Sequence, residues 1–486
     1  MSHNTMDLTQ GSPLRQLLVF SLPLVAGTLF QQLYSFVDTV MVGRLLGEQA
    51  LAAVGATYSL HFLTLGFVQG ACVGFGIPLA QAMGAKDPQE FKRYFWNGVW
   101  LGALLGAVMT LLTFAFARPL LHLIQTPEEI LPQAVTYIRI IFLGIPASVL
   151  YNFCAGALRA AGDSRRPTLF LLATSLLNIL LDYVFLVPVP LGVAGAALAT
   201  VLSQLASGLL NLGWMHFKTD LLRDCAGLRA PSRRHAARLC RVGLPMGFEY
   251  SVSALGAVVL QSAINALGIA AIAGQTAGDK IRQMFTLPME SVGMGMATYV
   301  GQNEGARRYD RIVGGIRAGL TIQWVYCAAA WAVLFVGKVP FTRLVLGAEA
   351  GESAALSVQY LGIISCLFCF HGALMILRNT LQGMGYSLHA VFSGVGELAG
   401  RALCGWAAVR TGSFVGVCLA NPAAWLLALG YCTLMVARFL RQRIKAESST
   451  SIRHPRAAGA GVIGVILRRR LDAGGRPARQ KSRSGR

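Results

Sequence analysis

Charged side chains are scarce in this chain. Only 13% of its 486 residues are Asp, Glu, Lys or Arg, whereas a soluble globular protein averages about 25%. Hydrophobic residues make up 55% of the sequence, and the mean hydropathy is positive. Because a soluble enzyme or binding domain needs a larger charged surface, the composition argues against those classes and indicates a protein embedded in a membrane.

The sequence also lacks the patterns of common chemistry. There is no GxxxxGK[ST] phosphate-binding loop, so we do not expect ATP to be the energy source. Most of the ten cysteines are scattered; Cys366 and Cys369 have CxxC spacing, but they stand in the apolar run CLFCF without further ligands nearby, so a buried helical pair is expected there. No coherent Ser–His–Asp arrangement is present. The first apolar stretch is too long for a cleavable signal peptide and should stay as a span. We expect no enzymatic activity, no cofactor and no metal.

Long apolar runs are what the chain has in abundance. A membrane-spanning helix needs about 20 apolar residues. The fold prediction is therefore an all-α polytopic membrane protein with 12 transmembrane helices. Twelve predicted spans lie at 15–41, 52–80, 94–117, 132–157, 167–188, 193–217, 242–268, 272–300, 314–336, 356–381, 387–409 and 414–440.

The distribution of basic residues predicts the orientation of these spans. The connections after the second, fourth, sixth and eighth spans are rich in Lys and Arg, whereas the odd-numbered connections are poor in them. The positive-inside rule then places both termini in the cytoplasm. In a prokaryotic host, the membrane would be the inner (plasma) membrane.

A repeat divides the chain into two lobes. At an offset of about 221 residues, Gln81 matches Gln302, Gly84 matches Gly305 and Lys86 matches Arg307. The offset contains six spans, an even number, so the lobes keep one orientation and are related by a pseudo-twofold axis along the membrane normal. The predicted parts are a cytoplasmic N-terminus (1–13), an N-lobe (14–217), a cytoplasmic linker (218–241), a C-lobe (242–440) and a basic tail (441–486).

The tail holds just over half of the net charge of +21. After Leu440 the chain has thirteen Lys or Arg residues and two acids. We expect this tail to be disordered and to lie near anionic lipid rather than to bind nucleic acid. The apolar run at 457–467 is too short to span a membrane.

Two acidic residues stand inside predicted spans, Asp38 in the first and Asp182 in the fifth. A carboxylate at membrane depth is costly, so it marks a candidate functional site. Asn178 precedes Asp182 by four residues and therefore lies on the same helical face. If the two acids share a cavity of low dielectric, they titrate as a coupled pair. These residues predict a proton or cation site inside the membrane.

The motifs resemble those of the MATE family, the multidrug and toxic compound extrusion transporters. The sequences LPLVAGTLFQQLYSFVDTVMVGRLLG, QxxGAxxxxxxxR and LRAxGDSRxP carry the resemblance, which covers roughly 14–440. The DinF-like branch, which the chain resembles, uses a proton-linked site in the N-lobe. The resemblance implies a cation- or proton-binding set at Asp38, Asn178, Asp182 and Thr200, with a hinge at Pro23. The sodium-linked branch uses C-lobe acids, at positions where this chain has Ser253 and His371.

The expected function is secondary active multidrug efflux by cation antiport, in which organic cations or amphiphilic drugs are exported by alternating access. Protons are the expected coupling ion. Alternatives are a sodium-coupled exporter and a lipid-linked oligosaccharide flippase of the same superfamily. We expect a monomer whose partners are these small molecules and membrane lipid. Whether the span charges Glu249, Glu397 and Arg401 are functional stays open. Candidate substrate-cavity residues are Tyr34, Gln204, Gln261, Gln283 and His371.

Overall fold

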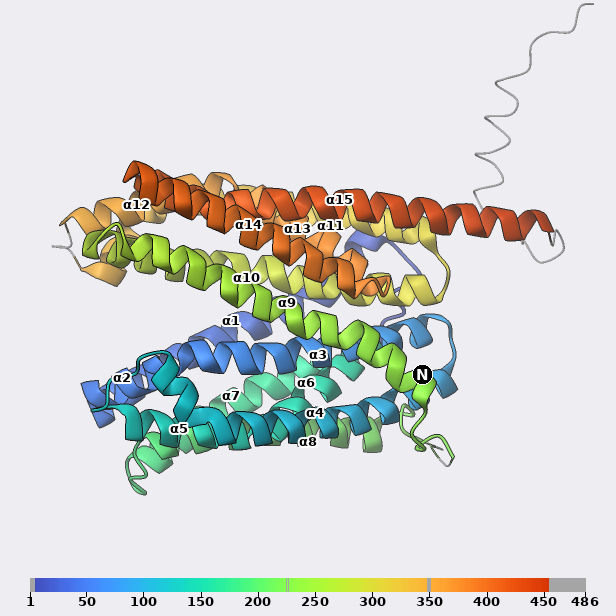
Figure 1. The fold of residues 1–486 in the computed structure, drawn as a ribbon. Helices are drawn as coiled ribbons and strands as arrows, with labels where there is room; N and C mark the ends of the chain where they lie inside the picture. Colours follow the sequence, from blue (N-terminus) through green and yellow to red (C-terminus); the bar gives the residue numbers. More distant parts are fainter. Residues whose placement is uncertain (1–4, 224, 226, 348–350, 454–486) are drawn as a thin grey trace, which may run out of the picture. The chain divides into compact units, whose positions relative to one another are not determined.

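The computed structural model describes residues 5–223, 225, 227–347 and 351–453, and within these ranges every regular element is an α-helix (Figure 1). The helices are α1 (Pro13–Leu46), α2 (Glu48–Ala56), α3 (Tyr58–Gly84), α4 (Pro88–Leu123), α5 (Leu131–Leu143), α6 (Ile145–Ala160), α7 (Arg165–Leu186), α8 (Val193–Lys218), α9 (Arg233–Asn265), α10 (Ile269–Gly305), α11 (Tyr309–Leu346), α12 (Gly351–Cys366), α13 (Phe368–Gly383), α14 (Ser387–Thr411) and α15 (Phe414–Arg453).

These helices confirm the predicted twelve-helix fold. Eight are individually long and apolar enough to cross a membrane, and two bent pairs raise the number to ten. The pairs are α5 with α6, bent by 43°, and α12 with α13, bent by 51°. The other two of the twelve spans are α10 and α14. They are 37 and 25 residues long, but they carry charged residues that lower their hydropathy.

Some boundaries differ from those read in the sequence. The second span was predicted to start at 52, which lies in α2, because the apolar run continues across the break at Thr57 between α2 and α3. Helix α9 starts at Arg233, inside the segment predicted as a linker, and α15 continues to Arg453, past the predicted start of the tail. The apolar run at 457–467 lies outside the described residues.

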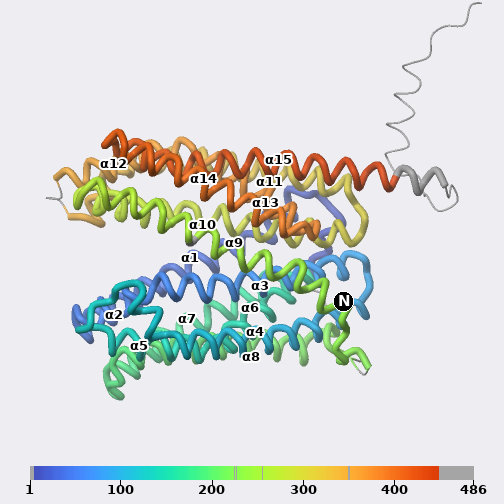
Figure 2. Tube along the Cα trace, viewed as in Figure 1, coloured from blue at the N-terminus to red at the C-terminus, as the bar shows by residue number. Residues whose placement is uncertain are grey.

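The chain divides into a compact unit, Met1–Val436, and a second unit, Ala437–Arg486. Within the first unit, α1–α8 form one half and α9–α14 with the start of α15 form the other, as the tube view also makes clear (Figure 2). The halves meet mainly where α3 packs on α9 and where α1 packs on α10. The first half corresponds to the predicted N-lobe and the second to the predicted C-lobe.

Close glycine contacts at these two seams repeat across the halves. A Cβ at Gly74 of α3 would lie 2.5 Å from the Cα of Gly243 in α9, and a Cβ at Gly295 of α10 would lie 2.3 Å from the Oγ of Ser21 in α1. Gly74 and Gly295 are equivalent in the sequence repeat. Small residues at such positions allow helix backbones to approach closely within a membrane. The contacts therefore follow the pseudo-twofold relation that the repeat predicts.

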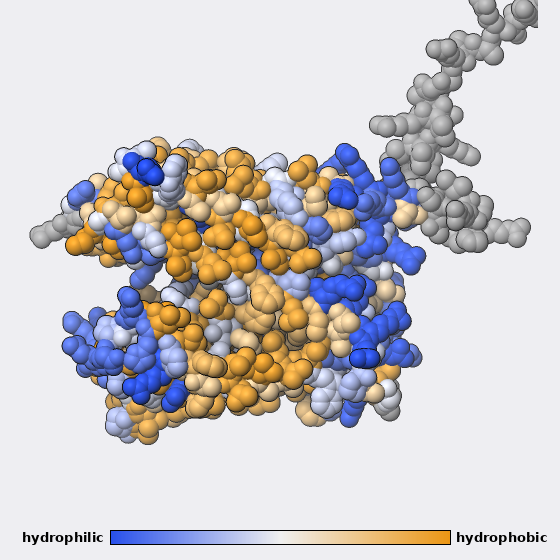
Figure 3. All heavy atoms as spheres, in the orientation of Figure 1, coloured by the Kyte–Doolittle hydropathy of each residue, from blue (hydrophilic) through white to orange (hydrophobic). Residues whose placement is uncertain are grey.

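The connections rich in Lys and Arg lie together at one end of the helices, here named the basic end (Figures 1 and 3). There, a Cβ at Gly84 would lie 1.8 Å from the carbonyl oxygen of Gln302, and a Cβ at Gly305 would lie 1.8 Å from that of Gln81. Lys86 and Arg307, the next equivalent pair, both adopt a positive φ, 57° and 56°. The two halves therefore meet at the basic end through two equivalent contacts, Gly84 with Gln302 and Gly305 with Gln81.

Residues 6–11, the N-terminal strap, cross the basic end from one half to the other. The amide of Met6 donates to the carbonyl of Gly162 at 3.1 Å, and the amide of Leu8 donates to Oε1 of Gln302 at 3.0 Å. Leu8 is fully buried. The guanidinium of Arg311 donates to the carbonyls of Leu8, Gln10 and Gly11 at 3.2, 3.1 and 2.8 Å.

The hydropathy of the surface agrees with a membrane location. Figure 3 shows a broad apolar belt between two hydrophilic ends, and a hollow between the two halves at the end opposite the basic end. Since the contacts of Gly84 and Gly305 join the halves at the basic end, the first unit is closed there and open at the other end.

Candidate functional site

Helices α1 and α7 pack together and bring Asp38 and Asp182, the acids inside the first and fifth predicted spans, close to each other. The carboxyl groups of Asp38 and Asp182 lie within hydrogen-bonding reach of each other. Asp182 is fully buried. Two ionised carboxylates cannot hydrogen-bond to each other, and neither oxygen of Asp182 nor Oδ1 of Asp38 has a donor in the described part of the chain. One proton shared between the acids would supply the missing donor.

Asn178 lies one helical turn before Asp182 on α7, on the same face of the helix. Its side chain is 1% exposed, and both its amide nitrogen and its amide oxygen lack partners among the described residues. A buried amide that makes no hydrogen bond costs about 1–3 kcal/mol. Asn178 and Asp182 are buried and Asp38 is half-buried, and all three side chains have donors or acceptors without partners among the described residues. Such groups are suited to a proton or a small cation.

The fourth residue of the predicted set is placed differently. Thr200 is half-buried on α8, a helix that packs against α7. The described contacts include no hydrogen bond from its hydroxyl to Asp38, Asn178 or Asp182. Its assignment to the proton or cation site therefore stays a prediction.

Two tyrosines lie beside the acid pair. The hydroxyl groups of Tyr34 in α1 and Tyr137 in α5 are within electrostatic range of both Asp38 and Asp182. Tyr137 is buried, and reasoning from the sequence missed it. No signal singled it out, because the run LPQAVTYIRIIFL is mostly apolar and α5 is far from both acids in the chain.

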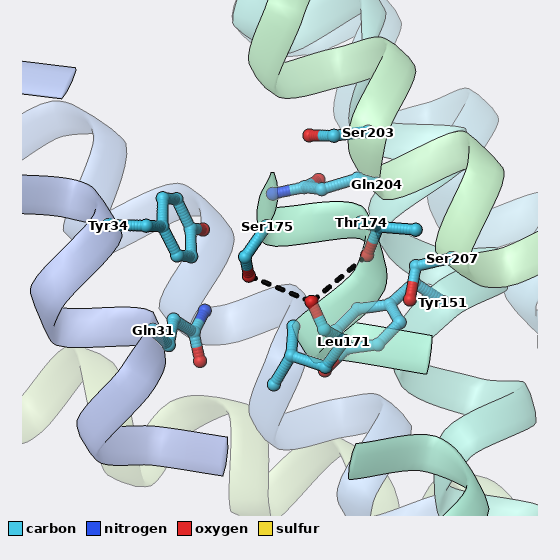
Figure 4. A pocket seen from close by; sticks show the side chains of 9 residues that line it. All are labelled: Gln31, Tyr34, Tyr151, Leu171, Thr174, Ser175, Ser203, Gln204 and Ser207. Atoms are coloured by element: carbon cyan, nitrogen blue, oxygen red, sulfur yellow. Dashed lines mark hydrogen bonds between the residues drawn. The ribbon is translucent and has the colours of Figure 1, made fainter. Parts of the chain in front are cut away.

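A pocket opens next to this cluster (Figure 4). Its wall is formed by α1, α6, α7 and α8, and its lining includes Tyr34 and Gln204, both predicted as cavity residues. The hydroxyl of Ser148 hydrogen-bonds to Oε1 of Gln204. The full lining is Gln31, Tyr34, Tyr151, Leu171, Thr174, Ser175, Ser203, Gln204 and Ser207.

The predicted hinge residue lies inside a continuous helix. Helix α1 runs through Pro23 from Pro13 to Leu46. Proline has no N–H, so the helix lacks one backbone hydrogen bond at this turn. The hydroxyl of Thr168 in α7 donates to the carbonyl of Pro23 at 3.2 Å, which ties this turn to α7, the helix that carries Asp182.

Comparison with known proteins identifies the family. The MatE family model matches the chain twice, over residues 23–184 and 245–396, once in each half. The chain belongs to the MatE family. The chain is 30% identical, over 79% of its length and 86% of the relative, to the probable multidrug resistance protein YpnP of Bacillus subtilis (strain 168). It is 26% identical, over 76% and 81%, to the probable multidrug resistance protein NorM of Thermotoga maritima.

Solved MATE structures share the fold. The crystal structure of MATE in complex with MaL6 superimposes with a TM-score of 0.84 at 22% identity, covering 90% of this chain and 99% of that one. Together with the family match, this places the chain among the MatE multidrug efflux transporters and makes it a multi-pass membrane protein.

The second half of this MatE chain contains a buried network of charges. Nη1 of Arg378 in α13 lies 3.1 Å from Oε1 of Glu249 in α9. Arg378 also pairs with Glu397 in α14. All three side chains are less than 10% exposed. Glu397 also pairs with Arg401 at 3.4 Å. The sequence analysis named Glu249, Glu397 and Arg401 as span charges but missed Arg378.

The network continues through α15, α12 and α10. Arg401 donates to Oδ1 of Asn421 at 3.1 Å, and the hydroxyl of Tyr360 donates to Asp279 at 2.9 Å. Arg282 pairs with the same Asp279 at 2.7 Å. Arg282, Arg378 and Arg401 thus pair with Asp279, Glu249 and Glu397 inside the second half.

The positions aligned with the sodium-linked branch carry no acid. Arg401 donates to the carbonyl of Ser253 at 3.2 Å, so a cationic side chain already contacts this position. Within the described residues, no group of three or more His, Cys, Asp or Glu is arranged to hold a metal ion.

The remaining predicted cavity residues lie away from the pocket of the first half. Gln261 is exposed on α9 and donates to Asn265 at 2.9 Å, and Gln283 is half-buried on α10. His371 is buried in α13, 3.9 Å from Glu290 of α10. These three belong to the second half, so their part in a substrate cavity stays a prediction.

Proposed function

We propose that this MatE chain exports organic cations and amphiphilic drugs in exchange for protons. The observation that carries the proposal is the buried contact between Asp38 and Asp182, which lacks a donor unless one carboxyl group holds a proton. Asn178 can donate to an ionised carboxylate or accept from a protonated one, so it can serve both states.

The open and closed ends suggest how transport alternates. We take the basic end to be cytoplasmic, following the positive-inside rule. The hollow at the opposite end then faces outward, and the contacts at Gly84 and Gly305 close the cytoplasmic side. In this outward-facing state, protons load the acid pair and the substrate leaves. In the inward-facing state, protons leave and the substrate binds.

Coupling requires that proton and substrate oppose each other's binding in one state. The pocket of Figure 4 lies beside the acid pair, since Tyr34 lines the pocket and is within electrostatic range of both carboxyl groups. A proton on the pair removes a negative charge from the pocket wall. A bound cation then loses electrostatic attraction, and its release is favoured.

The test uses the purified protein in liposomes with ethidium as the transported cation. A pH gradient and a sodium gradient are imposed separately. We expect transport with the pH gradient, none with the sodium gradient alone, and loss of transport in Asp38→Asn. Glu48→Gln is the matched control, because Glu48 is an acid at the start of α2, outside the pair.

Other outcomes point to other functions. Transport driven only by sodium would overturn the proton proposal in favour of a sodium-coupled exporter. Normal pH-driven export by Asp38→Asn would remove the acid pair from the mechanism. Transport of lipid-linked sugars with no movement of ethidium under either gradient would favour the flippase alternative.

A further inference from the structure

The N-terminal strap is bound to both halves at the basic end. On one side, the amide of Met6 donates to the carbonyl of Gly162, in the connection between α6 and α7 of the first half. On the other side, the amide of Leu8 donates to Gln302 and its carbonyl accepts from Asn303, both in the last turn of α10 in the second half. The strap therefore crosses the boundary between the halves, which has to widen when this end opens.

The first half holds the strap through backbone atoms. Gly162 has a φ of 92°, and a Cβ there would lie 2.1 Å from the carbonyl oxygen of Met6. Because the neighbouring atom is backbone, a side chain at residue 162 would displace the strap. The hydrogen bond between Met6 and Gly162 joins two uncharged groups, and such a bond is the weaker kind.

The second half holds the strap with charge-assisted hydrogen bonds. The guanidinium of Arg311 donates to three strap carbonyls, those of Leu8, Gln10 and Gly11. Its Nε donates to Oδ1 of Asn303 at 3.1 Å, and Asn303 in turn donates to the carbonyl of Leu8. Hydrogen bonds from an ionised donor are roughly twice as strong as neutral ones. When the halves separate, we expect the strap to stay on the second half and to leave the first.

The side chain of Gln302 connects the strap to the boundary between the halves. Its Oε1 accepts from the amide of Leu8, and its Nε2 donates to the carbonyl of Ala160 in α6 at 2.9 Å. The bond to Ala160 joins the second half to the first. Since the oxygen and the nitrogen of this amide are both bonded, its orientation is fixed. The strap therefore holds Gln302 in the position in which it joins the halves.

A matching junction lies on the other side of the pseudo-twofold axis. Gln81, the equivalent of Gln302 in the repeat, donates to the carbonyl of Gly383 at 3.0 Å. Its Oε1 accepts from Arg238 of α9 at 2.6 Å. Each glutamine thus donates to the opposite half, while its oxygen is held by a residue close to the beginning of α1 or α9. On the side of Gln302, that residue belongs to the strap.

We propose that the N-terminal strap is a latch for the basic end, which fixes the bond of Gln302 to the first half and must leave Gly162 before this end opens. The inference rests on the alternating access of the proposed function. It adds an element, outside the acid pair and the pocket, that sets how readily the cytoplasmic side opens.

The experiment measures opening of the basic end in the purified full-length protein in lipid nanodiscs. Spin labels are placed at Gln89 of α4 and Leu388 of α14, exposed positions of the two halves at that end. Attachment through p-acetylphenylalanine avoids the ten native cysteines. The pH is set where wild type shows both a short and a long distance between the labels. A single distance at every pH would refute alternating access, and the latch with it.

Arg311→Gln removes the ionised donor that holds three strap carbonyls. The ratio of the long to the short distance should therefore rise about tenfold or more. Arg317→Gln, at an exposed arginine of the same helix, is the matched control and should behave as wild type.

A second variant keeps the test independent of how Arg311→Gln folds. Deletion of residues 5–9 removes the contacts of Met6 and Leu8 and leaves Arg311 in place, and it should raise the same ratio. Thermal unfolding is measured in parallel. Lower thermal stability with an unchanged ratio in both variants would show that the strap only stabilises the fold, and would overturn the latch.

The two proposals can fail separately. A raised ratio in both strap variants, in a protein whose ethidium transport ignores the pH gradient, refutes proton coupling alone. Asp38-dependent, pH-driven transport in a protein whose distance ratio is unchanged by either strap variant refutes the latch alone.

Discussion

Gly84 contacts the backbone carbonyl of Gln302 so closely that a Cβ at residue 84 would lie 1.8 Å from that oxygen. Real Cβ atoms do not approach so near, and the neighbouring atom is backbone, which cannot rotate away. The same contact recurs between Gly305 and Gln81. Closure of the basic end therefore depends on the absence of side chains at two equivalent glycines.

Gly84→Ala should shift the protein away from the state closed at the basic end. Overpacking of a tight contact costs about 1–3 kcal/mol, enough to change the ratio of two states by roughly five- to more than a hundredfold. Distances between spin labels at positions 48 and 352, at the open end, measure the shift and should shorten. Gly213→Ala is the control, because a Cβ there meets nothing within 4 Å. Unchanged distances in Gly84→Ala would contradict this account of closure.

Arg378→Gln should destabilise the second half strongly. The substitution leaves Glu249 buried without a guanidinium and leaves Glu397 with Arg401 alone, and breaking a buried ion pair costs about 3–5 kcal/mol. Thermal unfolding of the purified protein measures the loss. Arg44→Gln, at an exposed arginine near the end of α1, should change little.

The double variant Arg378→Gln, Glu249→Gln tests whether charge is the cause. Removing the charge of Glu249, the acid left without an arginine, should recover part of the lost stability, because no uncompensated carboxylate then remains at this position. If the double variant is as unstable as the sum of its single variants, the loss arises from packing instead.

Asp163 at the basic end should make stability depend on pH. Burial raises the pKa of this carboxyl group, although the amides of Arg165 and Arg166 both donate to Oδ1 at 3.1 Å. A raised pKa means that the folded state holds the proton more tightly than the unfolded state, so the contribution of Asp163 to stability falls as the pH rises through its folded pKa.

Asp163→Asn should remove that pH dependence and keep the contacts that start α7, since an amide oxygen also accepts from the two backbone amides. Asp163→Ala should lose them and cost about 1 kcal/mol. Thermal unfolding at several pH values distinguishes the two. A pH profile of Asp163→Asn identical to wild type would show that Asp163 does not titrate as stated.

The sequence predicted those features that depend on local composition. Spans follow from apolar runs, and Asp38 and Asp182 were recognisable because a carboxylate is rare in such a run. The equivalence of Gly84 and Gly305 followed from the repeat. Each of these signals can be read within a few dozen residues or by comparing the two halves.

The features that were missed depend on contacts between distant segments. Arg378 and Glu249 pair although they are far apart in the chain, and neither stands in a motif. The position of Tyr137 near the acids depends on how α5 packs against the rest of the first half. The exposure of Gln261 also could not be predicted from helical periodicity, because polar residues of a span in a bundle can lie on its lipid-facing or its protein-facing side.

The N-terminal strap has a consequence for biosynthesis. Leu8 is synthesised well before its partners: its amide donates to Gln302 and its carbonyl accepts from Asn303, which are 294 and 295 residues later in the chain. At about 5–20 residues per second, roughly 15–60 s pass before these partners exist. During that time the completed first half has an apolar leucine without its burial site. The basic end therefore closes only after translation has passed Arg311, and a ribosome stalled earlier leaves a membrane protein that is open at this end.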